Sequence, residues 1–167
     1  MPLQVAVCGP RHCTEDDKSH AYEVGILLAQ AGAIVICGGG TGVMAAVAAG
    51  VRAGNGLVIG VRPGNTAADA SPDLSAVIVT NLGEARNAII VVWSADAVIA
   101  IGGSWGTLSE IALAKRRGDV PVITLGSWII LDRDGNPLPE SVTVASSPRQ
   151  AVDLALAVRQ VRHQETI

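Results

Sequence analysis

Short apolar runs rich in β-branched residues alternate along the chain with stretches of helical periodicity. The runs, each predicted to form a strand, are Leu3–Cys8, Ala33–Cys37, Leu57–Val61, Ala76–Thr80, Asp96–Ile101 and Val120–Leu125. The predicted helices are Asp17–Ala31, Gly42–Ala53, Leu82–Ser94, Gly106–Arg117 and Pro148–His163. This alternation favours a parallel sheet with crossover helices, and continuous hydrophobicity favours strands buried on both faces. We therefore expect an α/β doubly wound fold in a single domain over residues 1–167, with a mostly parallel sheet and helices on both faces.

The segment 127–144 departs from this alternation. Residues 132–137 read Asp-Arg-Asp-Gly-Asn-Pro, a sequence typical of a tight turn, so we expect a hairpin turn between two short strands. The segment does not match a calcium-binding loop, because Pro137 stands where that loop requires glycine and Thr143 where it requires glutamate.

The composition points to a small ligand and to self-association. Charged residues make up only 16% of the 167 residues, against about 25% in an average protein, so we expect a homodimer or a higher homo-oligomer. Trp105 and Trp93 are candidates for that interface, although core packing explains Trp93 equally well. The net charge of −3, with no basic cluster larger than Lys115–Arg117, argues against nucleic acid or an anionic membrane as a partner.

An uncharged stretch between Glu23 and Arg52 has the length of a membrane span but not its character. Gly32 and the glycine run at 38–42 divide it into a helix end, a strand and a turn. The three cysteines lack metal-ligand or CxxC spacing, which fits reduced thiols, and no secretory signal opens the chain. We expect a cytoplasmic protein.

A glycine-rich turn follows the second predicted strand and opens a helix. It reads Gly38-Gly39-Gly40-Thr41-Gly42. Glycines allow the backbone to approach an anion closely and to adopt positive φ, and helix amino termini present free N–H groups. The turn matches neither the dinucleotide fingerprint nor the lysine-containing P-loop. It is therefore either a phosphate turn of another kind or a tight connection without a ligand.

A second glycine turn, Gly102-Gly103-Ser104-Trp105-Gly106, follows the predicted strand Asp96–Ile101 and also opens a helix. Thr107 and Glu110 have the spacing of a capping box, and for Glu110 alone that structural role is favoured. Carboxyl ends of parallel strands meet at one sheet edge, where ligands bind in such folds. Two glycine turns at this edge favour a shared phosphate-binding pocket.

Arg86 is the third informative residue. In the predicted helix it shares a stripe with Ile89 and Trp93 near the same sheet edge. There its guanidinium could bind a phosphate or a ribose hydroxyl through a forked hydrogen bond. The alternative is an arginine whose aliphatic stem covers the core while its charge reaches water.

Together these segments resemble the Lonely Guy family, formerly labelled lysine decarboxylase-like, within a wider group of Rossmann-like nucleotide-binding proteins. The resemblance covers about residues 3–125, and its most specific part is the GGxxGTxxE segment at 102–110. It implies a Rossmann-like fold. The family's enzymes are phosphoribohydrolases in which an arginine and the glutamate of a PGGxGTxxE motif carry the hydrolysis, which by resemblance assigns catalysis to Arg86 and Glu110.

This sequence departs from the enzymes at three places. Ile101 stands where they have proline, Asn87 where they have lysine, and the first glycine turn is one residue shorter. The pattern is more similar to a branch of small relatives that includes molybdenum-cofactor carrier proteins. A decarboxylase with pyridoxal phosphate would need a Schiff-base lysine, and the only lysines are Lys18 and Lys115. We expect no resident cofactor.

Two functions from different classes follow. The first is hydrolysis of the N-glycosidic bond of a nucleoside 5'-monophosphate, in which Glu110 stabilises an oxocarbenium-like transition state and handles water. The second is a carrier or sensor that binds a phosphorylated ligand, such as molybdenum cofactor, without reaction. The ligand-binding residues predicted for both are Gly9, Gly38, Gly39, Gly40, Thr41, Gly42, Met44, Arg86, Asn87, Gly102, Gly103, Ser104, Trp105, Gly106 and Thr107. A metal site built from His12, His20, Cys8 and Cys13 has no supporting spacing, and we expect none.

Overall fold

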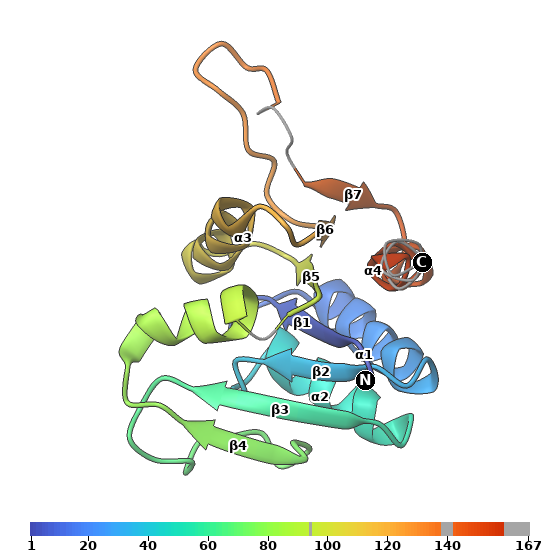
Figure 1. The fold of residues 1–167 in the computed structure, drawn as a ribbon, viewed down its shortest axis with the longest axis vertical. Helices are drawn as coiled ribbons and strands as arrows, with labels where there is room; N and C mark the ends of the chain where they lie inside the picture. Colours follow the sequence, from blue (N-terminus) through green and yellow to red (C-terminus); the bar gives the residue numbers. More distant parts are fainter. Residues whose placement is uncertain (94, 138–141, 159–167) are drawn as a thin grey trace.

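A parallel sheet of seven strands forms the centre of the structure (Figure 1). In this computed structural model residues 1–93, 95–137 and 142–158 are described. The strand order is β4-β3-β2-β1-β5-β6-β7, and every neighbouring pair is parallel. The strands are β1 (Gln4–Cys8), β2 (Ile34–Cys37), β3 (Leu57–Arg62), β4 (Ala76–Val79), β5 (Ala97–Ile101), β6 (Val122–Leu125) and β7 (Thr143–Ala145). The predicted α/β fold with a parallel sheet is confirmed.

Helices cover both faces of the sheet, as predicted (Figure 1). One face carries α1 (Glu15–Gln30), α2 (Val43–Ala53) and α4 (Pro148–Leu156). The other carries α3 (Trp105–Arg117) and the π-helical η2 (Ile89–Trp93).

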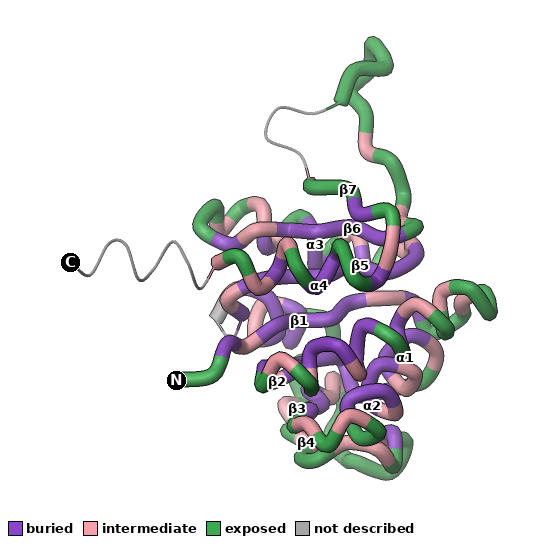
Figure 2. Tube along the Cα trace, turned by 90° about the vertical axis from the view of Figure 1, so that its right-hand side faces the viewer, coloured by how far each residue is buried: buried purple, intermediate pink, exposed green. Residues whose placement is uncertain are grey.

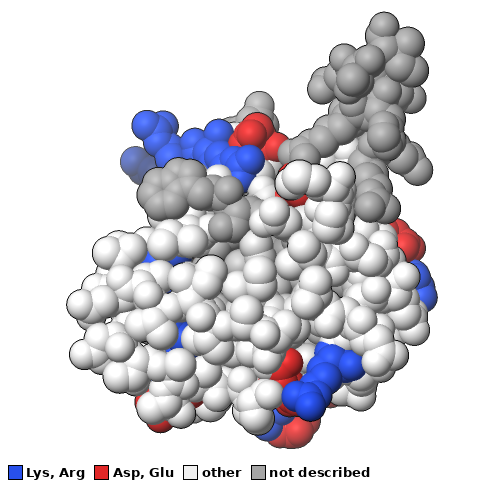
Figure 3. All heavy atoms as spheres, turned by 60° about the horizontal axis from the view of Figure 1, so that its bottom comes forward, with Lys and Arg blue, Asp and Glu red and all other residues white. Residues whose placement is uncertain are grey.

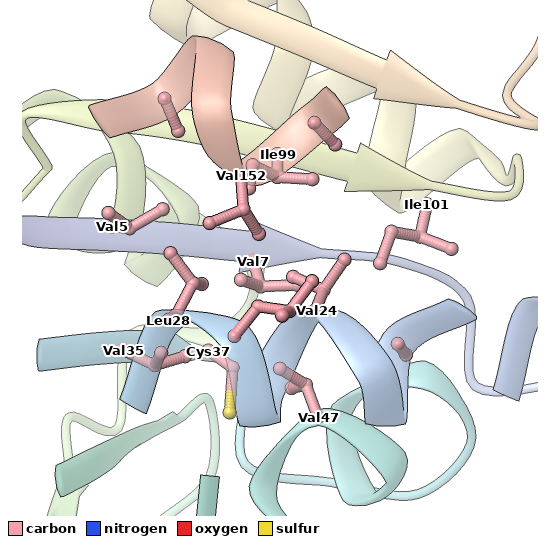
Figure 4. Packing of buried hydrophobic residues seen from close by; sticks show 14 of the residues in the cluster. Val5, Val7, Val24, Leu28, Val35, Cys37, Val47, Ile99, Ile101 and Val152 are labelled. Carbon is pink, nitrogen blue, oxygen red and sulfur yellow. The ribbon is translucent and has the colours of Figure 1, made fainter. Parts of the chain in front are cut away.

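Each central strand contributes side chains to both cores. In β1, Val5 and Val7 face the first core, while Ala6 and Cys8 face the second. Figure 4 shows Val5, Val7 and Ile99 of the sheet meeting Leu28 and Val152 of the helices. All residues of β5 and β6 are buried, which Figure 2 shows as continuous purple tube. Continuous hydrophobicity in the sequence therefore reflects two-sided burial.

The sheet has a topological switch point between β1 and β5. The strand order runs from β1 through β2 and β3 to β4 on one side, and the chain then returns to β5 on the other. Helix α1 follows β1 on one face, and α3 follows β5 on the opposite face. Such a point opens a crevice beyond the carboxyl ends of the two strands. Cys8 and Ile101 end these strands and lead into the predicted site.

The helix predicted at Leu82–Ser94 is not a regular α-helix. A 3₁₀ turn, η1 (Gly83–Arg86), is followed by η2, and Ser94 lies outside the described residues. Gly83 has a φ of 56°, which is incompatible with a regular α-helix at this residue, and the β-branched run that follows crowds the preceding turn. The last predicted helix extends to His163, which also lies outside the described residues; α4 ends at Leu156.

The hairpin turn is present, but the described residues on either side of it do not form the two predicted strands. The Asp132 carboxylate accepts hydrogen bonds from the backbone N–H groups of Asp134 and Asn136, at 2.8 and 2.9 Å. In the described residues, the arms form one antiparallel bridge between Leu131 and Pro137. Thr143–Ala145 instead pairs in parallel with β6. The free backbone groups of β6 at the sheet edge explain this, because an edge strand accepts a partner.

No helix in the described part of the chain is long and apolar enough to cross a bilayer. The uncharged stretch contains the predicted helix end, strand and turn, which are the end of α1, strand β2 and the turn at 38–42, and it continues into most of α2.

The surface at the β4 edge carries few charges. Figure 3 views the molecule from this side and shows a broad area without acidic or basic side chains. Exposed apolar side chains on this part of the chain are Leu57, Ile78, Val79 and Leu82. This is the type of surface from which self-association is expected.

Glycines allow α1 and α2 to cross at close range. A Cβ on Gly25 would lie 2.5 Å from the carbonyl oxygen of Val47. A Cβ on Gly50 would overlap the carbonyl oxygen of Tyr22. Both obstacles are backbone atoms, which cannot turn aside as a side chain does, so this helix pair requires glycine at its contact.

Substitution Gly50→Ala tests this close crossing. The added methyl must push α1 and α2 apart, so we expect the free energy of unfolding to fall by about 2 kcal/mol. Urea unfolding measures the change. Gly64→Ala is the matched control, because a Cβ there meets no atom within 4 Å. Equal stability of the two variants would contradict the contact.

Candidate functional site

A cavity of about 140 Å³ lies at the switch point, beyond the ends of β1 and β5. It is lined by Gly9, Pro10, Arg11, Met44, Glu84, Arg86, Asn87, Ser104, Gly106, Thr107 and Glu110. The chain thus brings together residues that follow β1, open α2, form η1 and open α3. Eight of the predicted site residues line it, namely Gly9, Met44, Arg86, Asn87, Ser104, Gly106, Thr107 and Glu110.

Helix α3 begins one residue earlier than predicted and has a different cap. Ser104 has extended backbone angles, and its hydroxyl accepts a hydrogen bond from the N–H of Thr107 at 3.1 Å. The predicted capping box of Thr107 with Glu110 is therefore wrong, because Thr107 already lies inside the first helical turn. Glu110 lies in the next turn, where its side chain lines the cavity.

Glu110 is a buried carboxyl group, and burial destabilises its charged form. Its side chain is almost completely shielded from water, and this burial raises its pKa to about 7. The nearby Arg86 charge and a hydrogen bond from the Cys8 thiol act in the opposite direction and lower the pKa. At neutral pH the group is therefore divided between its acid and its carboxylate forms. It can donate a proton to a bound anion or accept one from water.

Arg86 holds a buried positive charge with unused donors. The residue is only 7% exposed. Its Nε and Nη1 atoms are buried and make no hydrogen bond in the described structure. A guanidinium stays protonated in proteins, and a buried donor without a partner is costly. Arg86 also lines the cavity, so an anion bound there would lie beside this positive charge.

The first glycine turn packs against arginine side chains near the cavity. Residues 38–42 are not among those that line it. A Cβ on Gly38 would lie 2.5 Å from Nη1 of Arg86. A Cβ on Gly40 would lie 3.0 Å from Nη1 of Arg62. The glycines therefore make room for two arginine side chains.

Gly42 closes the same turn. Its φ is 66°, and a Cβ there would overlap the carbonyl oxygens of Pro10 and Arg11. The N–H of Val43, first in α2, donates to the carbonyl oxygen of Pro10 at 3.1 Å. This helix end thus packs against the loop after β1, and the exposed Thr41 stays outside the cavity lining.

In the second turn, Gly102, Gly103 and Trp105 also lie outside the cavity lining. Gly102 has a φ of 65°, and a Cβ on it would lie 3.0 Å from the Asp17 carboxyl group. Gly103 packs directly against the indole of Trp128. Trp105 is 79% exposed and contacts Trp128 edge to face.

Asn87 stands where the resemblance places a lysine in the enzymes. It is buried, and its Nδ2 donates to Glu84 and to Ser109, both at 3.4 Å. Its Oδ1 is buried without a hydrogen-bond partner in the described structure. A neutral amide at this position leaves Arg86 as the buried cation of the cavity lining.

The sequence analysis did not predict five residues at or near the site. Pro10, Arg11 and Glu84 line the cavity, Cys8 contacts Glu110, and Arg62 lies across the first glycine turn. The Nε atom of Arg62 is buried without a hydrogen-bond partner in the described structure. Cys8, Arg11 and Arg62 lie at or beyond carboxyl ends of strands, and this position in the sequence is the signal that would have found them. In the described part of the chain, no group of three or more histidine, cysteine or acidic side chains is arranged to hold a metal ion.

The raised pKa of Glu110 predicts how stability changes with pH. A free glutamate titrates near 4.5 and the folded Glu110 near 7, so between these values the folded chain holds more protons and stability falls as pH rises. Between about pH 5 and about pH 8, the free energy of unfolding should fall in the wild type by on the order of 3 kcal/mol more than in Glu110→Gln. Urea unfolding at both pH values measures this. Equal losses would contradict the buried carboxyl.

Comparison with known proteins agrees with this architecture. The model of the SLOG cluster4 family matches residues 2–152. An uncharacterized protein of Archaeoglobus fulgidus is 36% identical over 93% of this chain and 95% of its own length.

Two solved structures are similar over almost the whole chain. One is the molybdenum cofactor binding protein of Rippkaea orientalis, with a TM-score of 0.85 and 35% identity over 95% of this chain and 98% of that protein. The other is the molybdenum cofactor carrier protein of Chlamydomonas reinhardtii, with a TM-score of 0.80 and 29% identity over 96% and 99%. These findings confirm the resemblance to this branch of Lonely Guy-like proteins. With its parallel sheet, its switch-point cavity and a match to the family model over residues 2–152, the chain belongs to the SLOG cluster4 family.

Proposed function

We propose that this protein binds the phosphate group of a small ligand in the switch-point cavity and carries that ligand without converting it. The observation that supports this most is the buried guanidinium of Arg86, whose Nε and Nη1 lack acceptors. Because two similar structures belong to proteins named for molybdenum cofactor, a phosphorylated pterin of this kind is the leading candidate for the ligand.

The cavity offers complementary groups for a phosphate. Arg86 provides charge-assisted donors, and the Thr107 hydroxyl lies in the lining. The N–H groups of Trp105 and Gly106 belong to the first turn of α3, where helix geometry gives them no intrahelical acceptor. The helix dipole adds a favourable field at this end. Glu110 in its acid form adds a further donor, and an approaching anion would favour that form.

The predicted glycosidase activity is the second candidate function. It is favoured by a buried glutamate that titrates near 7 beside an arginine, a pairing suited to general base catalysis. The carrier proposal is preferred because Asn87 supplies no positive charge where the enzymes have lysine. It is also preferred because half-neutral Glu110 is poorly suited to stabilise an oxocarbenium ion by charge. Both functions use the same phosphate site.

The proposal also covers the binding partners, the cellular compartment and the self-association of the chain. The ligand is a small molecule, with neither nucleic acid nor membrane as the main partner. The working compartment is the cytoplasm, and the chain self-associates, in keeping with its low content of charged residues and the apolar β4 edge.

Substitution Arg86→Met tests the phosphate site. Removing the charge-assisted hydrogen bonds should weaken binding of ribose 5-phosphate by about 10- to 100-fold. Isothermal titration calorimetry measures the affinity. Arg116→Met removes an exposed arginine of α3 and is the matched control, with affinity expected to match that of the wild type. Equal binding by both variants would contradict the site.

The cargo is tested in cells that make molybdenum cofactor. Wild-type protein purified from them should retain molybdenum and pterin in equal amounts, and Arg86→Met should retain neither. Metal analysis and fluorescence of the oxidised pterin give both contents. Wild-type protein that binds ribose 5-phosphate but retains no pterin would point to another phosphorylated cargo.

Substitution Glu110→Gln separates carriage from hydrolysis. We expect neither wild type nor variant to release base from a panel of nucleoside 5'-monophosphates, and both to bind ribose 5-phosphate, because glutamine keeps a donor in the cavity. Chromatography of the released base is the measurement. If the wild type released base and ribose 5-phosphate and Glu110→Gln did not, the glycosidase function would replace carriage.

A further inference from the structure

Two of the few aromatic residues of this chain lie together beside the cavity. The sequence has three tryptophans, one tyrosine and no phenylalanine. Trp105 and Trp128 meet with ring centroids 5.4 Å apart and an interplanar angle of 85°. Both are well exposed, at 79% and 45%. Large exposed indoles are unusual and mark binding surfaces when they gather in one place.

The backbone holds these two tryptophans beside the cavity. Trp105 is the first residue of α3, between Ser104 and Gly106, and both of these neighbours line the cavity. Trp128 packs against Gly103, where any side chain would collide with its indole. Gly103 therefore has a defined role, which is to hold the indole of Trp128 against the second glycine turn.

Two lining residues of the cavity also lie against the neighbourhood of Trp128. Ser104 and Thr107 line both the cavity and a narrow apolar crevice, whose other walls include Leu108, Ile111 and Trp128. Ser104 and Thr107 thus lie between the cavity and Trp128. At about 140 Å³ the cavity is also smaller than the roughly 300–1,000 Å³ of typical ligand sites, so most of a ligand of that size must lie outside it.

We infer that Trp105, held edge-on by Trp128, is the platform on which the flat fused heteroaromatic ring of the ligand stacks while the ligand's phosphate occupies the cavity. The inference rests on the proposed function and extends it, because it assigns specificity for pterin- or purine-like rings to the exposed indoles. Aromatic stacking suits this task, since it accepts any planar ring and strengthens binding substantially.

The experiment compares two probes that share a phosphate. GMP carries a fused ring, whereas ribose 5-phosphate does not, so the ratio of their affinities reports the ring alone. In the wild type GMP should bind about tenfold more tightly than ribose 5-phosphate. Trp105→Ala should abolish this advantage without changing the affinity for ribose 5-phosphate, and Trp105→Tyr should restore most of it. Calorimetry measures both ligands.

Ile129→Ala is the matched control, because Ile129 is an exposed apolar residue next to Trp128. It should leave the affinity ratio unchanged. An unchanged ratio in Trp105→Ala would overturn the inference and leave the phosphate site intact. The inference would also be overturned if light scattering showed that Trp105→Ala and Ile129→Ala both dissociate an oligomer while GMP affinity persists, since a second copy would then cover the indoles. Failure of the wild type to bind ribose 5-phosphate would overturn both the platform and the phosphate site.

Discussion

A buried positive charge without an acceptor is the constraint on which the site depends. Arg86 is shielded from water and has two nitrogen atoms without hydrogen-bond partners in the described structure. Folding such a group is costly unless something in the cavity compensates. Gly38 gives the guanidinium room by lacking a side chain, and the switch point between β1 and β5 supplies the cavity.

Glu110 is the internal group best placed to compensate, and burial prevents it from doing so fully. Desolvation raises its pKa to about 7, so near neutral pH the carboxyl is ionised in only part of the molecules. A phosphate brings the negative charge that the cavity lacks and can accept a hydrogen bond from the protonated form of Glu110. The pair therefore fits reversible anion binding, in which protonation of Glu110 accompanies the arrival of the ligand.

Much of this could be predicted from the sequence, and the rest required three-dimensional neighbours. Continuous apolar runs predicted the buried parallel strands, while Arg86 and Glu110 were chosen from motif spacing and a family resemblance. The sequence analysis expected the helix cap at Thr107, whereas the backbone angles show that the cap is Ser104. The first glycine turn was expected to contact the ligand, yet it lies against arginine side chains that come from distant segments. Such contacts between remote parts of the chain leave no local pattern.

The central claim is that Arg86 binds a phosphate in the switch-point cavity. A crystal structure of the protein in complex with ribose 5-phosphate tests it most directly. The account predicts that the phosphate lies in the switch-point cavity, with oxygen atoms at about 2.7–2.9 Å from the guanidinium nitrogens of Arg86. The claim would be contradicted if the phosphate bound elsewhere, or if Arg86 turned to pair with a carboxylate of the protein and left the cavity to water.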